Sequence, residues 1–114
     1  NQGSDITYAD SATLGASFTI NTNGVYAISY CDNFTGAASI LGVSIDSNQL
    51  TTVVQNITTS TVLFVIYLPS ANAPVGDAST IYLPAGSVVR AHTNGSATGS
   101  APALGVTFTI TRVS

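Results

Sequence analysis

Residues 18–46 read FTINTNGVYAISYCDNFTGAASILGVSID, and their pattern decides the fold class. Large apolar side chains alternate with small or polar ones on both sides of the turn NTNG at residues 21–24, which is the period of a half-buried strand. The Asn-Gly pair in this turn accepts the positive φ of a tight hairpin. A loop at residues 32–36 leads into another alternating segment at residues 39–46. The stretch therefore predicts consecutive antiparallel β-strands.

The rest of the chain repeats this pattern and has no helical periodicity. Residues 62–68 are apolar on both faces, which is typical of a strand that is buried on both sides or that lines a subunit interface. Residues 1–12 are polar and indicate a linker or a short edge strand, and residues 13–114 form one domain. The expected strands are residues 13–20, 25–31, 39–46, 50–57, 61–68, 80–83, 88–92 and 106–113, with loops at 70–77 and 93–104. Regularly spaced strands of this kind predict an antiparallel β-sandwich, specifically a jelly roll.

The chain carries very little charge. Charged residues make up 6% of the 114 residues, and neither Lys nor Glu occurs. Arg90 and Arg112 cannot form the basic patch that nucleic-acid binding requires. No apolar run approaches the roughly 20 residues of a spanning helix, so we expect no membrane insertion. A surface with so few charges indicates either an oligomer that covers much of it or a weakly charged extracellular domain.

The sequence presents no motif for catalysis, for a cofactor or for a metal ion. Its acids are five Asp residues whose spacing does not require any two to converge, and no Gly-x-Ser-x-Gly turn surrounds a serine. Cys31 is the single cysteine, and nothing in the spacing pairs it with His92. We therefore expect no enzyme activity, no cofactor and no metal site.

Polar and aromatic residues near strand ends are the candidates for ligand contact. Phe34 lies near the tip of the predicted loop at residues 32–36, where it can stack on a ligand or plug the loop onto the core. Arg90 and His92 share one face of a strand and can hold a sugar or an anion, or serve a structural role. The candidate ligand-binding residues are Asp32, Asn33, Phe34, Arg90, His92 and Asn94.

Several segments resemble the jelly roll of the tumour-necrosis-factor-like and complement-globular-head-like families. They are FTI followed by GVYAISY at residues 18–30, LGVSI at residues 41–45 with Asn48, and LPAGSVV at residues 83–89. The segment VTFTITRV at residues 106–113 is similar to the closing strand of these families. Ser87 departs from the pattern, because these families usually carry Asp there.

The resemblance implies a homotrimer that forms the C-terminal head of an extracellular fibrous protein. Similar Ser-, Thr- and Asn-rich domains occur at the tips of bacteriophage tail spikes and fibres, which implies a virion tail, host attachment and binding to a cell-surface glycan or host receptor. Similar domains also form the heads of bacterial collagen-like spore-surface glycoproteins, so a spore-surface or adhesin head is an alternative. A purely structural trimerisation cap without a ligand is another.

Large apolar residues of the expected strands are the candidates for the trimer interface. The pattern does not tell which of these side chains fill the sandwich and which face a neighbouring subunit. The expected interface residues are Tyr26, Ile28, Tyr30, Phe64, Ile66, Phe108 and Ile110.

Overall fold

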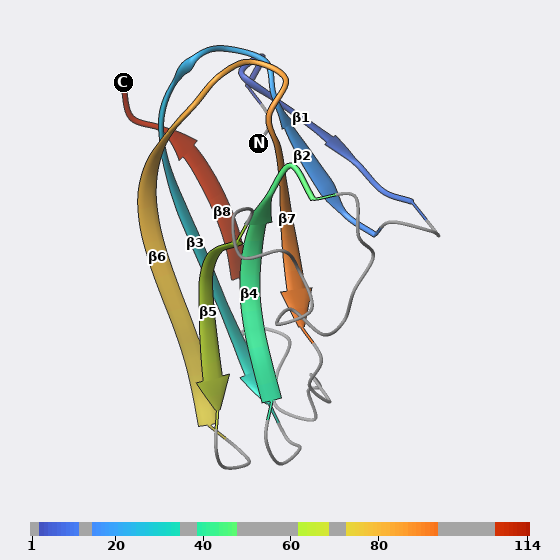
Figure 1. Ribbon diagram of the computed structural model, residues 1–114, viewed down its shortest axis with the longest axis vertical. Coiled ribbons are helices and arrows are strands. Elements are labelled where there is room, and N and C mark those ends of the chain that lie inside the picture. Colours follow the sequence, from blue (N-terminus) through green and yellow to red (C-terminus); the bar gives the residue numbers. More distant parts are fainter. Residues whose placement is uncertain (1–2, 12–14, 35–38, 48–61, 69–72, 94–106) are drawn as a thin grey trace.

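The computed structural model describes residues 3–11, 15–34, 39–47, 62–68, 73–93 and 107–114. Within these residues the chain consists of strands, turns and extended segments, without a helix (Figure 1). The strands are β1 (Ile6–Ala9), β2 (Ser17–Ile20), β3 (Gly24–Phe34), β4 (Ser39–Ile45), β5 (Val62–Leu68), β6 (Ala73–Leu83), β7 (Val88–Thr93) and β8 (Thr107–Arg112).

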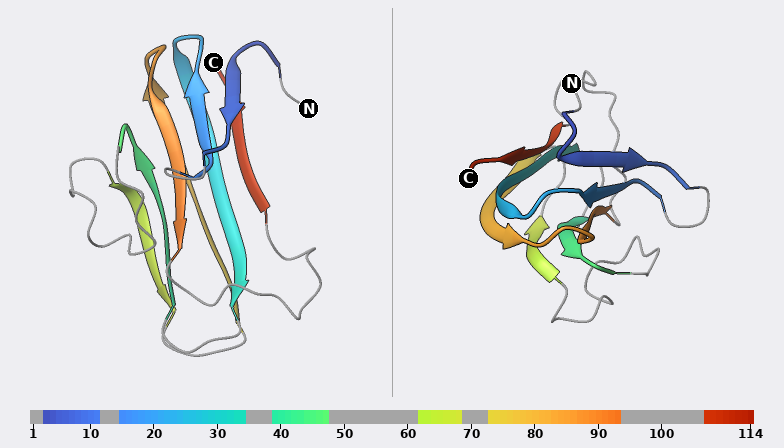
Figure 2. Two further views of the ribbon diagram at one scale, coloured as in Figure 1. Left: turned by 90° about the vertical axis from the view of Figure 1, so that its right-hand side faces the viewer. Right: turned by 90° about the horizontal axis from the view of Figure 1, so that it is seen from above.

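These strands form two antiparallel sheets that face one another (Figure 2). The larger sheet has the order β1-β2-β7-β4-β5, and the smaller sheet has the order β6-β3-β8. This arrangement confirms the predicted all-β class and agrees with a β-sandwich. At the start of the chain, where a linker or a short edge strand was expected, the structure has the edge strand β1.

The core lies between the two sheets and follows the predicted alternation. On β3, Tyr26, Ile28 and Tyr30 are buried, while the residues between them are only half-buried. Burying a large apolar side chain stabilises a fold by about 1.5–3 kcal/mol, so this inner layer is the main source of stability. The buried apolar residues are Ile20, Tyr26, Ile28, Tyr30, Leu41, Val43, Leu83 and Val89.

The predicted hairpin at residues 21–24 is wrong. β2 pairs with β1 and β7, whereas β3 pairs with β6 and β8, so this connection crosses from one sheet to the other. Among the described residues, positive φ occurs at Gly15, Asp46 and Gly86 and not in this turn. The polar sequence marks the end of β2 correctly, but it does not determine which strand pairs with which.

Strands β3 and β6 are longer than predicted. Residues 32–34, which were expected in a loop, pair with residues 73–75 of the expected loop at 70–77, for example Asn33 with Pro74. The ladder continues from Cys31, which pairs with Gly76. Pro74 is tolerated because β6 is at an edge of its sheet, where one row of N–H groups needs no partner. Pairing over the full length of both strands therefore overrides the local turn signals. The strand expected at residues 50–57 lies outside the described residues.

The two sides of the sandwich differ, and we name them for use below. On the closed side, β5 of the larger sheet lies against β6 of the smaller sheet (Figure 1). On the open side, the sheets end in β1 and β8. In the described part of the chain, β1 pairs only with β2 and β8 pairs only with β3. Among the described residues, the edge strands of both sides therefore lack a further hydrogen-bonded neighbour, but only on the closed side do the two edge strands lie against one another.

Candidate functional site

The predicted ligand residues do not form one exposed cluster in the described part of the chain. Asp32, Asn33 and Phe34 belong to β3, and Arg90 and His92 belong to β7 of the opposite sheet. The side chains of Asn33 and Phe34, and the whole of Asn94, lie outside the described part. Residues 32–34 of the expected loop are the end of β3, so the prediction that Phe34 sits at a loop tip is wrong, and residues 35 and 36 lie outside the described part.

The described members of this set make hydrogen bonds within the protein. Asp32 is buried, and its Oδ2 accepts a hydrogen bond from the Tyr30 hydroxyl at 3.1 Å. His92 is buried, with Nε2 2.7 Å from the Ser44 hydroxyl. Arg90 Nε donates to the Ser47 carbonyl oxygen at 2.9 Å. These contacts favour the structural role that the sequence left open for Arg90 and His92.

The predicted interface residues separate into two groups. Tyr26, Ile28 and Tyr30 are enclosed by their own chain and belong to its core, so their side chains are not available to a neighbouring subunit. This corrects the interface prediction for these three residues. The remaining four are only half-buried and pack at the margin of the core: Phe64, Ile66, Phe108 and Ile110.

A groove of about 600 Å³ opens between β8 and the β1–β2 pair. Its apolar wall is formed by Phe18, Phe108 and Ile110. Its polar end is formed by Asp5 and Arg112. The groove lies on the open side, where no strand of the described residues lies between the edges β1 and β8. Figure 2 shows these two strands on the same side of the molecule. The groove is larger than the pocket on the closed side that is described below. Its full lining is Gly3, Asp5, Ile6, Phe18, Phe108, Thr109, Ile110, Thr111 and Arg112.

A row of aromatic rings crosses from one sheet to the other beside this groove. Tyr8 on β1 contacts Phe18 on β2, with ring centroids 5.2 Å apart. Phe18 stacks on Phe108 of β8 at 4.9 Å, and Phe108 meets the edge of Tyr30 on β3 at 5.6 Å. Such pairs contribute about 0.5–1.5 kcal/mol each beyond the area that they bury. The row holds β2 against β8, but Tyr8 at its end remains 42% exposed.

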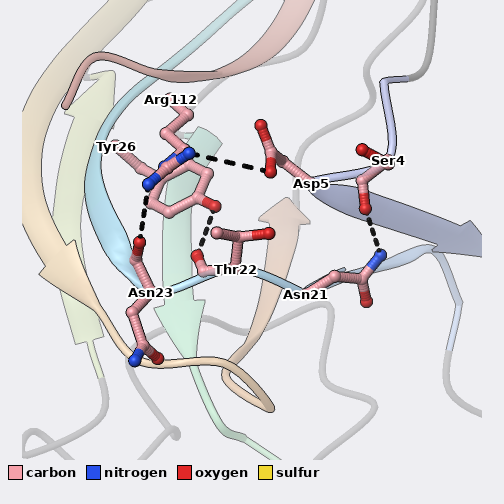
Figure 3. A network of polar contacts seen from close by, with 7 residues as sticks. All are labelled: Ser4, Asp5, Asn21, Thr22, Asn23, Tyr26 and Arg112. Atoms are coloured by element: carbon pink, nitrogen blue, oxygen red, sulfur yellow. Dashed lines mark hydrogen bonds and ion pairs between the residues drawn. The ribbon is translucent and has the colours of Figure 1, made fainter.

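Polar contacts join the strand ends at the top of the open side (Figure 3). The Arg112 guanidinium lies 3.9 Å from the Asp5 carboxylate and donates to the Asn23 carbonyl oxygen at 3.1 Å. The Asn21 side-chain amide donates to the Ser4 carbonyl oxygen at 2.9 Å. The Tyr26 hydroxyl donates to the Thr22 carbonyl oxygen at 2.6 Å. These contacts link β1, the β2–β3 connection and β8 at one end of the groove.

Two core tyrosines have a raised pKa. Burial raises the pKa of Tyr30, and the nearby Asp32 carboxylate adds to the effect because it disfavours a second negative charge. Burial also raises the pKa of Tyr26, with a smaller contribution from Asp5. Both phenols therefore stay protonated at neutral pH and act as hydrogen-bond donors, not as bases.

A second, shallower pocket of about 260 Å³ lies at the upper end of the closed side. Tyr82 forms part of its wall and is 60% exposed, which makes it the most exposed large hydrophobic residue of the described part. Asp46 and Ser87 bring polar groups to the same pocket. Sequence reasoning missed this site, because a strand pattern does not reveal that an aromatic residue is left uncovered.

The described residues contain no group of three or more His, Cys, Asp or Glu side chains that could hold a metal ion. In the same part of the chain, no helix has the length and apolar character to cross a membrane. Neither a protein-family model nor a curated protein sequence matches this chain significantly. The site must therefore be interpreted from its own geometry.

Proposed function

We propose that this chain is a jelly-roll head domain whose main role is to assemble an extracellular fibrous protein into a homotrimer. The observation that carries the proposal is the open side, where a groove with apolar walls meets two strand edges that have no hydrogen-bonded neighbour in the described part of the chain. Exposed apolar surface beside free edges favours association with other chains. The low charge of the chain acts in the same direction, because few like charges hold neighbouring copies apart.

Strand pairing supports the jelly-roll part of the proposal. β4 pairs with β5, β3 with β6, and β2 with β7, so the pairs are nested around one central hairpin. The pairs β4–β7 and β3–β8 join these nested pairs into the two sheets. A jelly roll has this kind of winding in two packed sheets. In the nested order, β1 would be the partner of β8, but here it pairs with β2.

The resemblance favours the head of a phage tail spike or fibre as the biological setting. A spore-surface or adhesin head is the alternative, and the same assembly role serves both. Any hydrolase activity of such a fibre would belong to another domain. The free edges and the groove do not depend on which of these settings applies.

Glycan recognition is a second candidate function, and the exposed Tyr82 favours it. Sugar rings stack on exposed aromatic rings, and the exposed Asp46 carboxylate can accept hydrogen bonds beside it. In this proposal the receptor contacts lie at the Tyr82 pocket rather than at Arg90 and His92. Without such binding, the domain is a purely structural trimerisation cap.

The solution mass of the purified domain tests the assembly role. Light scattering in neutral buffer at micromolar concentration is expected to give the mass of three chains. A single-chain mass at all accessible concentrations would overturn the trimer.

A glycan array tests the recognition role separately. Tyr82→Ala is expected to abolish any glycan signal. Thr80→Ala, an exposed residue two positions earlier on the same strand, is expected to leave the signal unchanged. Equal signals from wild type and Tyr82→Ala would remove the pocket from consideration.

A further inference from the structure

We infer that neighbouring copies of this chain complete one another's open side, with β1 of one copy pairing in antiparallel fashion with β8 of the next. This inference rests on the proposed trimer and names the contact that would hold it together. The open edges, their directions and their side chains each support it.

The two edges are placed so that one copy can serve the next. Both lie on the same side of the molecule, and β1 and β8 run in opposite directions (Figures 1 and 2). Rotation about an axis parallel to the strands leaves strand directions unchanged. A neighbouring β1 brought to β8 by such a rotation is therefore antiparallel to it, like every other strand pair in the molecule.

The two open edges carry few of the features that usually prevent pairing. Natural edge strands are protected by charges, by proline, by bulges or by a covering segment. The sequence ITYA of β1 contains no charge and no proline, and TFTITR of β8 contains no proline and a single charge, Arg112, at its last residue. Of the edge strands on the closed side, β6 carries Pro74 and Asp77, while β5 has neither charge nor proline but lies against β6. The open side is thus the less protected side of the described sandwich.

The side chains of the two edges also match. With Ile6 opposite Ile110 of the neighbour, Tyr8 lies opposite Phe108, so apolar residues meet on the inner face. On the outer face, Thr7 then lies opposite Thr109, and cross-strand Thr pairs are favourable. Tyr8, which is exposed in one chain, becomes covered. Because every copy carries both edges, each neighbour in a ring supplies the strand that one edge lacks, so that all edges are paired, whereas a single foreign strand satisfies only one.

The contact is head-to-tail, so it closes into a ring when each copy uses both edges once. In the proposed trimer, the ring places β1 and β8 alternately around the three-fold axis. The apolar walls of the three grooves then face the interior of the assembly. The groove is in this view the space that a neighbouring β1 and its side chains occupy.

Cysteine cross-linking tests the contact directly. The double variant Thr7→Cys/Thr109→Cys, made in a Cys31→Ser background, is oxidised and run on a non-reducing gel. We expect a covalent trimer that reverts to single chains on reduction. Thr7 and Thr109 are on the outer faces of opposite sheets, so they cannot link within one chain. Each single variant, and the pair Thr7→Cys/Thr80→Cys, is expected to show no covalent oligomer on the gel.

The gel and the solution mass together separate the two proposals. A three-chain mass without cross-linking would overturn the β1–β8 contact and leave the trimer intact. A covalent product that stops at two chains, with a two-chain mass, would support the contact and overturn the trimer. A single-chain mass with no cross-link would overturn both.

A charge placed on the edge provides an independent measurement that does not depend on disulfide geometry. Tyr8→Asp is expected to raise the concentration at which the assembly dissociates by about tenfold or more, because a carboxylate would be buried in the contact. Tyr82→Asp, which also replaces an exposed tyrosine, is the matched control and is expected to leave that concentration unchanged. Equal behaviour of the two variants would overturn the contact.

Discussion

The closed and open sides of the sandwich are built from the same kind of sequence. β5 and β8 both consist mainly of apolar and β-branched residues and carry almost no charge, and each is an edge strand of its sheet. β5 lies against β6 of the facing sheet, whereas β8 lines a groove. The difference teaches that an apolar strand does not by itself indicate an interface. The presence or absence of a facing strand decides which apolar residues remain available.

The largest effect we expect comes from a matched pair of isoleucines that oppose one another in the smaller sheet. Ile28 on β3 is buried, and its register partner Ile110 on β8 is half-buried at the open side. Ile28→Ala is expected to lower the free energy of unfolding by about 2–5 kcal/mol, and Ile110→Ala by less than half of that in single chains. Urea denaturation measures both. If both variants lost the same free energy of unfolding in single chains, the open side would already be as well packed as the core.

A smaller effect is expected where β8 joins β3. A Cβ on Gly24 would collide with the Ser114 carbonyl oxygen and would lie 2.7 Å from Arg112 Nε. Gly24→Ala is therefore expected to cost about 1–3 kcal/mol and to loosen the end of β8. Gly3→Ala is the control, because nothing lies within 4 Å of its Cβ position. Thermal unfolding of both variants checks the prediction. If Gly24→Ala unfolded at the same temperature as the wild type, β8 would not be held tightly at this end.

The pH dependence of stability probes Tyr30, whose ring contacts Phe108 of the open side. Its pKa is raised above the ordinary value of 10.0 in the folded chain, so the unfolded chain loses this proton first. The stabilising contribution of protonated Tyr30 to the free energy of unfolding is fully present below pH 10. It declines as the pH rises further, by at most about 1.4 kcal/mol per pH unit. Tyr30→Phe is expected to flatten this decline in denaturation curves collected above pH 10. An unchanged slope would show that Tyr30 ionises equally in both states.

The smallest effect concerns the ion pair that links the two edges at the top of the groove. Asp5 and Arg112 are 3.9 Å apart and more than a third exposed. Asp5→Asn is expected to change the free energy of unfolding by about 0–1 kcal/mol, and added salt is expected to reduce the difference further. A larger loss would mean that this pair, and not the aromatic row, holds β1 to β8.

Several features of the fold were predictable from sequence because they depend on local alternation. The faces of β3 with Tyr26, Ile28 and Tyr30, and of β8 with Phe108 and Ile110, follow the period of two residues. Strand partners were not predictable, because alternation is the same whichever strand lies beside it. Thus the turn before Gly24 was taken for a hairpin, and the long β3–β6 ladder was not foreseen.

The candidate site was harder to predict than the fold. The groove brings together residues near Asp5, Phe18 and Ile110, which are far apart in the sequence and meet only through the sheet order. The alternation of Ile6 and Tyr8 was the available signal for a second interacting edge, but the polar surroundings left a linker and a short edge strand equally open. Alternation along a strand did not reveal that the ligand candidates Asp32 and His92 are buried, with Asp32 bonded to Tyr30 on its own strand and His92 to Ser44, 48 residues away.

The nested strand pairing has a consequence for how fast the chain folds. Ser29 on β3 contacts Thr109 on β8 although 80 residues separate them. Loops of that length are slow to close, and β-sandwiches dominated by such contacts fold in milliseconds to seconds. Until β8 docks, the outer edge of β3 is also open to other chains. We therefore expect refolding yield to fall as protein concentration rises, because docking of β8 then competes with encounters between incomplete chains.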